Sequence, residues 1–108
     1  MFARVARFEG VDVEEAGRTL ADADKIIGPL VEGLPGYRGQ LQLVGDGGEV
    51  LSVALFESEE DARAAEPTFD EEMPRRLGDL FQGWQGRRVS AGRYAVVVDD
   101  LRHGPAEA

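Results

Sequence analysis

Several side chains in this sequence could take part in chemistry at a single site. Tyr37 could donate a hydrogen bond to a substrate oxygen, and Trp84 could stack on a planar substrate. Arg75 and Arg76 could hold a carboxylate or an enolate through paired N–H groups. The only histidine, His103, could act as a general base, although it lies in a polar C-terminal segment. The pattern therefore offers candidate substrate-binding groups and assigns no catalytic residue.

Each of these candidates also has a structural interpretation. Tyr37 could pack beneath the helices, and Trp84 could plug one end of the core or a dimer contact. His103 could be a solvated residue of the tail. The two arginines could pair along an exposed helix face. Their acidic neighbours at helical spacing are Asp70, Glu71, Glu72 and Asp79.

A stripe of large apolar residues recurs at helical spacing in the second half of the chain. Its members are Phe69, Met73, Leu77 and Phe81. Such a stripe is typical of a helix face buried in a core, and it could also line an apolar cavity. Together with Tyr37, Arg75 and Trp84, these four residues form the predicted substrate-binding set.

No metal or phosphate site is expected from the sequence. The carboxylates of Asp70, Glu71 and Glu72 are adjacent, so on a helix they point in different directions. The Asp46-Gly47-Gly48 segment links two predicted strands and does not open a helix, as a phosphate-binding loop would. The chain has no cysteine, which excludes disulfides and thiolate chemistry.

The overall composition indicates one globular domain of residues 1–101, followed by a short polar tail of residues 102–108. The net charge of −9 argues against nucleic acid as a partner, because binding to DNA or RNA is largely neutralisation of phosphates. The sequence has neither an apolar run of about 20 residues nor the order of a signal peptide. We therefore expect no membrane association and a cytoplasmic location.

Hydrophobic periodicity and turn residues predict the order βαββαβ. Strands are expected over residues 2–9, 37–45, 49–57 and 88–99, the last centred on residues 94–98. The first helix should begin after Asp12, which with Glu15 has the spacing of a capping box, and should kink or break at Pro29. The second should be capped by Ser58 and be broken by prolines at positions 67 and 74.

The strand patterns favour a homodimer formed through the sheet. In the second strand, Tyr37 is expected to share one face with Gly39, Leu41 and Leu43, whereas the other face is mostly polar. The third strand, residues 49–57, is apolar on both faces, yet two helices can cover only one. A second copy of the sheet would cover the other. Four arginines also lie on predicted strands, and one of them could be a buried charge facing the partner sheet: Arg4, Arg7, Arg88 and Arg93.

The order of motifs resembles that of the antibiotic-biosynthesis-monooxygenase-like (ABM) proteins of the dimeric α+β barrel superfamily. The similarity lies in Pro-Gly-Tyr-Arg-Gly at residues 35–39, the Asp-Gly-Gly turn, and Leu-Ser-Val-Ala-Leu-Phe-Glu-Ser-Glu-Glu-Asp-Ala at residues 51–62. The resemblance implies an α+β, ferredoxin-like fold, with four antiparallel strands and two helices on one face. It also implies a ligand cavity between the second helix and the sheet.

The same resemblance bears on cofactors. Haem-degrading relatives use a histidine on the second helix together with a nearby asparagine, but residues 59–82 contain no histidine and the chain contains no asparagine. No cofactor is therefore expected. The leading hypothesis is a cofactor-independent monooxygenase, or a related enzyme, acting on an apolar aromatic substrate. The alternatives are a non-enzymatic ligand-binding or stress-related module, and a dimer whose cavity is filled.

Overall fold

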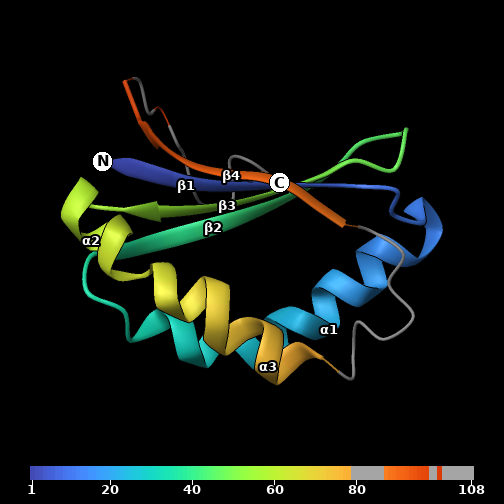
Figure 1. The fold of residues 1–108 in the computed structure, drawn as a ribbon, viewed down its shortest axis with the longest axis horizontal. Helices are drawn as coiled ribbons and strands as arrows, with labels where there is room; N and C mark the ends of the chain where they lie inside the picture. Colours follow the sequence, from blue (N-terminus) through green and yellow to red (C-terminus); the bar gives the residue numbers. More distant parts are fainter. Residues whose placement is uncertain (79–86, 98–99, 101–108) are drawn as a thin grey trace.

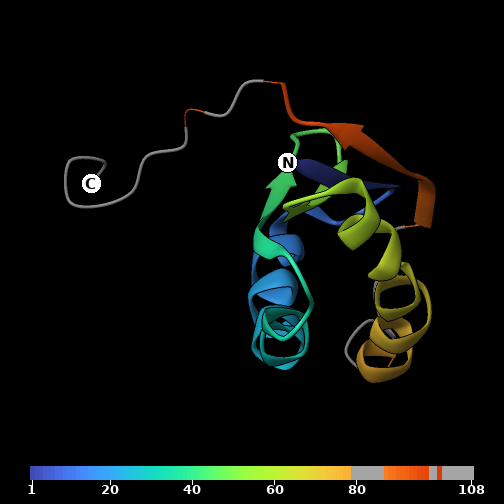
Figure 2. The ribbon, with the colours of Figure 1, turned by 90° about the vertical axis from the view of Figure 1, so that its left-hand side faces the viewer.

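The computed structural model describes residues 1–78, 87–97 and 100 and confirms the predicted α+β, ferredoxin-like architecture. The elements, in order, are β1 (Phe2–Glu9), α1 (Val13–Glu32), β2 (Tyr37–Val44), β3 (Val50–Phe56), α2 (Glu59–Ala64), a π-helical turn η1 (Thr68–Glu72), α3 (Met73–Leu77) and β4 (Arg87–Ala95). The antiparallel sheet has the order β2-β3-β1-β4. All helices lie on one of its faces (Figures 1 and 2). No helix among the described residues is long and apolar enough to cross a membrane.

Helix α1 runs through Pro29 without a break, so the short second helix that could have begun there does not form. Gly28 precedes the proline and has no Cβ to clash with the pyrrolidine ring. Ile27 and Val31, on either side of Pro29, are both buried against α3, and this packing holds one continuous helix. At its start, the side chain of Asp12 accepts a hydrogen bond from the amide of Glu14, whereas the amide of Glu15 donates to the backbone carbonyl of Asp12.

The turn before β2 is coupled to the start of α2 through Gly36. Its φ of 72° favours glycine, and a Cβ there would overlap the carboxylate of Asp61. The Gly36 carbonyl accepts a hydrogen bond from the amide of Glu57, and the Ser58 hydroxyl accepts one from the amide of Asp61, as expected of an N-cap. The Pro-Gly-Tyr motif therefore fixes where the second helical segment begins.

The second helical segment is broken into three pieces, as its prolines predicted. Pro74 has no N–H for the carbonyl of Asp70, four residues earlier. The backbone instead forms a π-type hydrogen bond from the Met73 amide to the Thr68 carbonyl. This widened turn carries both Phe69 and Asp70 toward the sheet.

The expected facing of β2 is wrong for Tyr37. The register between β2 and β3 shifts between Tyr37 and Gly39, where glycine adopts a φ of 132°. The bulge places Tyr37 on the helix side, where its ring packs edge-on to Phe56. Leu41 and Leu43 remain on the opposite, helix-free face, each 47% exposed.

Strand β4 ends earlier than predicted. It pairs with β1 as far as Ala95 opposite Phe2, and the amide of Val96 then bonds to the carbonyl of Met1. The next two residues are not part of the strand, and Val97 is 89% exposed. Apolar composition favoured a longer strand, but pairing decides where a strand stops.

Candidate functional site

A cavity of about 490 Å³ lies between the sheet and the two helical segments. Its size is within the usual range of small-molecule sites. Strand residues at alternate positions form its roof, and α1, η1 and α3 form its walls. The strands contribute Arg4, Ala6, Phe8, Gln40, Gln42, Val50, Ser52 and Arg88, and the helical segments contribute Leu20, Ala23, Asp24, Ile27, Phe69, Asp70, Met73, Pro74 and Leu77.

The sheet register explains why the cavity is open at its centre. The middle of the roof is made of Ala6 and Ser52, which are paired across β1 and β3 and have small side chains. Larger polar side chains flank this centre: Gln40 and Gln42 on β2, and Arg4 on β1. Because neighbouring strands are about 4.8 Å apart, Gln40 and Arg4 are separated by about 10 Å across the sheet.

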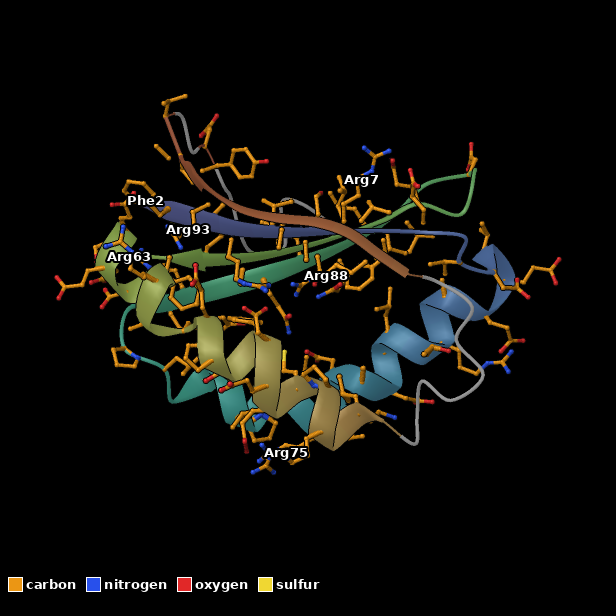
Figure 3. The ribbon with its side chains drawn as sticks, viewed as in Figure 1. Phe2, Arg7, Arg63, Arg75, Arg88 and Arg93 are labelled. Carbon is orange, nitrogen blue, oxygen red and sulfur yellow. The ribbon has the colours of Figure 1, made fainter. Side chains whose placement is uncertain are left out.

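Arg4 is the one buried charged residue among those described, with 6% of its surface exposed. Its guanidinium donates to Asp70 at 2.7 Å and lies over the Phe69 ring, 4.6 Å from the centroid. Arg88 donates to the same Asp70 oxygen at 2.9 Å and points into the space between sheet and helices (Figure 3). Two cations therefore share one carboxylate, which leaves positive charge on this side of the cavity.

Burial lowers the pKa of Arg4, and Arg88 lowers it further, whereas Asp70 opposes both effects. Arg4 nevertheless remains a cation at neutral pH, because an arginine side chain titrates far above it. A desolvated cation of this kind interacts with an oxyanion more strongly than an exposed one does.

A chain of amide hydrogen bonds lies on the other side of the cavity. Gln40 donates through Nε2 to a carboxylate oxygen of Asp24 at 2.6 Å, and Gln42 donates through Nε2 to Oε1 of Gln40 at 3.2 Å. Oε1 of Gln42 is buried and, within the described part of the chain, has no hydrogen-bond partner. This oxygen has essentially no surface accessible from the cavity.

Comparison with solved structures identifies the fold that carries this cavity. A dimeric ferredoxin-like protein from an uncultured marine organism gives a TM-score of 0.69 at 14% identity, over 94% of this chain and 98% of that one. The ActVA-Orf6 monooxygenase of Streptomyces coelicolor, in complex with nanaomycin D, gives 0.66 at 18% identity, over 94% and 92%. SnoaB, a cofactor-independent oxygenase from Streptomyces nogalater, gives 0.59 at 12% identity, over 94% and 97%.

The chain has an ABM-like fold. No family model matches the sequence, and no curated protein matches it. The similarity to the solved structures confirms the predicted resemblance to ABM proteins at the level of the fold.

The ABM-like fold brings some of the predicted site residues together. Phe69, Met73 and Leu77 line the cavity, whereas Tyr37 packs beside it in the core. Arg75 lies on the solvent side of α3, pairs with Glu72 at 3.3 Å and points away from the sheet (Figure 3). Phe81 and Trp84 lie outside the described residues, as do His103 and the predicted tail.

Several cavity residues were not among the predicted set. Asp24, Gln40, Gln42 and Ser52 were not proposed as site residues. Arg4 was one of four strand arginines, any one of which could have faced a partner sheet, and it lies on the helix side. The alternation of side chains along β2 could have indicated Gln40 and Gln42, because both glutamines lie on the side of the sheet that the helices cover.

Within residues 1–78, 87–97 and 100, no three acidic, histidine or cysteine side chains form a group that could hold a metal ion.

Proposed function

We propose that this ABM-like chain is a cofactor-independent monooxygenase that acts on a planar, mostly apolar phenol in the cavity between sheet and helices. The observation that carries the proposal is the cavity of about 490 Å³, apolar over most of its lining, with the buried cation of Arg4 on one wall. Phe69, Met73 and Leu77 would pack against the substrate rings. Arg4 and Arg88 would hold its oxygen.

The chemistry needs little from the protein beyond charge stabilisation and exclusion of water. A phenol converted to a quinone loses its hydroxyl proton and one ring hydrogen, and the ring carbon gains one oxygen atom from O2. The second oxygen atom leaves as water with those two hydrogens, so the substrate supplies all of the electrons. Negative charge develops on the phenol oxygen as it loses its proton, and the guanidinium groups of Arg4 and Arg88 favour that state.

The structural neighbours support this proposal. One is a monooxygenase in complex with nanaomycin D, and another is described as a cofactor-independent oxygenase. Both share the fold over at least 92% of either chain. The predicted cytoplasmic location remains part of the proposal.

A ligand-binding module without catalysis is the second candidate. This candidate is favoured by the hydrogen bonds of the carboxylates in the cavity wall. Asp24 accepts a hydrogen bond from Gln40, and Asp70 accepts hydrogen bonds from Arg4 and Arg88. Both carboxylates therefore bind polar groups of the protein itself, which favours a binding role over general-base catalysis.

We also infer that the chain forms a homodimer through the helix-free face of its sheet. This face exposes Leu41 and Leu43 of β2 and Tyr94 of β4. Leu51, Val53 and Leu55 lie on β3, between β2 and β1. An apolar face of this kind is typical of an interface. One of the neighbours is a dimeric ferredoxin-like protein.

Oxygen uptake distinguishes the two candidates. With a panel of hydroxynaphthalenes, a monooxygenase consumes one O2 per quinone formed. Ala6→Leu, which fills the cavity from the centre of its roof, should abolish uptake without lowering the melting temperature. Ala21→Leu, at an exposed position of α1, is the matched control. Ligand-induced stabilisation without uptake favours the binding module, and neither effect in any panel member would overturn both.

A further inference from the structure

A second, polar hollow of about 420 Å³ lies beside the cavity, between the edge strand β4 and the helical segments, and is called the polar pocket below. Ala91 and Gly92 of β4 line it and leave it open, because they carry almost no side chain. Arg4, Asp70 and Arg88 line both the polar pocket and the cavity. The two spaces are therefore adjacent and meet at these three side chains.

Opposite charges line the two sides of the polar pocket. The sheet contributes three guanidinium groups and the helical segments contribute three carboxylates: Arg4, Arg88 and Arg93 on one side, and Glu59, Glu66 and Asp70 on the other. The formal charges of this lining cancel. An anionic group would therefore meet the carboxylates, and a cationic group would meet the guanidinium groups. A neutral group that both donates and accepts hydrogen bonds suits both sides.

The ion pairs across the polar pocket leave hydrogen-bonding capacity unused. Nη1 of Arg93 contacts Oε1 of Glu66, and Nη1 of Arg88 donates to Oδ1 of Asp70 at 2.9 Å. Among the described residues, the second oxygen of each carboxylate accepts no hydrogen bond, and each of these two arginines donates through one nitrogen only. The four side chains are 32–45% exposed, so part of each is open to a molecule in the pocket.

We propose that the polar pocket takes a neutral, hydroxyl-rich substituent, such as a sugar, of an aromatic ligand whose rings occupy the cavity. A hydroxyl group can donate to a carboxylate and accept from a guanidinium group, and both hydrogen bonds are charge-assisted. Because the two spaces meet at Arg4, Asp70 and Arg88, the substituent is attached next to the phenol oxygen that the two arginines hold. The inference rests on the proposed binding function of the cavity and deepens it by naming the ligand class.

A matched pair of ligands tests the polar pocket. The probes are 3-methoxy-2-naphthol and 3-hydroxy-2-naphthyl β-D-glucoside, in which glucose replaces the methyl group. They share the naphthol for the cavity and differ in the group that reaches the polar pocket. Binding is measured by calorimetry at neutral pH. We expect the glucoside to bind the unmodified protein about tenfold more tightly, the effect of about one net hydrogen bond to a charged group.

Variants of β4 locate the sugar. Ala91→Leu fills the polar pocket from an exposed position of the strand and should reduce the advantage of the glucoside to less than about twofold. Ala95→Leu makes the same change at the end of β4, at an exposed position that lines neither space. This matched control should keep the full advantage.

A charged sugar tests the balance of charges in the pocket. 3-Hydroxy-2-naphthyl β-D-glucuronide adds one carboxylate to the same ligand and should bind the unmodified protein no more tightly than the glucoside. Glu66→Gln removes one negative charge from the lining and keeps an acceptor for Arg93. In this variant, the affinity for the glucuronide should rise about threefold relative to that for the glucoside, the effect of one partly exposed charge.

The outcomes distinguish this inference from the proposed function. Equal or weaker binding of the glucoside to the unmodified protein would overturn the inference and leave the cavity a binding site for naphthols. An undiminished advantage in Ala91→Leu would mean that the sugar lies elsewhere. Tighter binding of the glucuronide to the unmodified protein would overturn the choice of a neutral group. Absence of binding by every probe would overturn the proposed binding function and the inference together.

Discussion

Arg4 on β1 and Asp70 on the π-helical turn are 66 positions apart and form an ion pair at 2.7 Å. The arginine side chain is 7% exposed and the carboxylate 42%, so the pair lies at the edge of the cavity rather than on the open surface. This pair joins the centre of the sheet to the broken helical segment.

Removing the carboxylate should destabilise the fold. Asp70→Asn leaves Arg4 and Arg88 without their shared anion. We expect a loss in the free energy of unfolding between the roughly 1 kcal/mol of exposed pairs and the roughly 3–5 kcal/mol of fully buried ones. Denaturant unfolding measures it. Arg4→Met, which removes the buried cation and fills its volume, should cost less. An equal or larger loss in Arg4→Met would refute this account.

Restoring a backbone donor in the π-helical turn should impair the site. Pro74→Ala supplies an N–H to the carbonyl of Asp70, which favours ordinary α-helical geometry. Phe69 and Asp70 then lose their positions beside Arg4, and we expect affinity for 3-methoxy-2-naphthol to fall by about fivefold, or about 1 kcal/mol. Pro67→Ala, about two turns earlier, is the control. Unchanged affinity in Pro74→Ala would contradict a role for the widened turn.

The exposed face of the sheet should control oligomeric state. Leu41→Glu places a charge in the proposed interface, where the symmetry of a dimer would bring two such charges into one buried surface. Sedimentation at micromolar concentration should show a dimer for the unmodified chain and a monomer for the variant. Ile26→Glu, at a similarly exposed position of α1, should remain dimeric. A monomeric unmodified chain would rule out the interface.

Tyr37 should titrate above the usual range of a phenol. Burial raises its pKa, and the negative charges of Asp24 and Glu32 raise it further. In Tyr94→Phe, Tyr37 is the only tyrosine, so ultraviolet absorbance of tyrosinate reports it alone. The folded variant should ionise at higher pH than the same variant in denaturant. Coincident curves would contradict the burial of the hydroxyl group.

The sign of the linked stability follows from that shift. Because the pKa of Tyr37 is higher in the folded state, its contribution is fully present below about pH 10, where the phenol of the unfolded chain begins to ionise. It is lost as pH rises through the folded-state pKa. Tyr37→Phe should therefore show a weaker decline of unfolding free energy above about pH 10 than the unmodified chain does.

Local chemistry made most of the fold predictable. Gly36, Ser58 and Pro74 each act on the backbone within a few residues, so the turn, the helix start and the broken helical segment could be inferred from sequence. The helix break considered at Pro29 does not occur, because a break depends on whether the neighbouring side chains have another element to pack against. Ile27 and Val31 do, against α3, and the helix continues.

The sequence by itself determined the element order, the apolar stripe of Phe69, Met73 and Leu77, and the apolar character of β3 on both faces. Each of these depends on periodicity or on a local backbone preference. Only the tertiary structure decided which polar residues meet in the cavity. Arg4 reaches Asp70, and Gln42 reaches Asp24 through Gln40, because strand register and a single bulge set which side chains face the helices. A one-residue shift reverses that choice, and no local pattern specifies it.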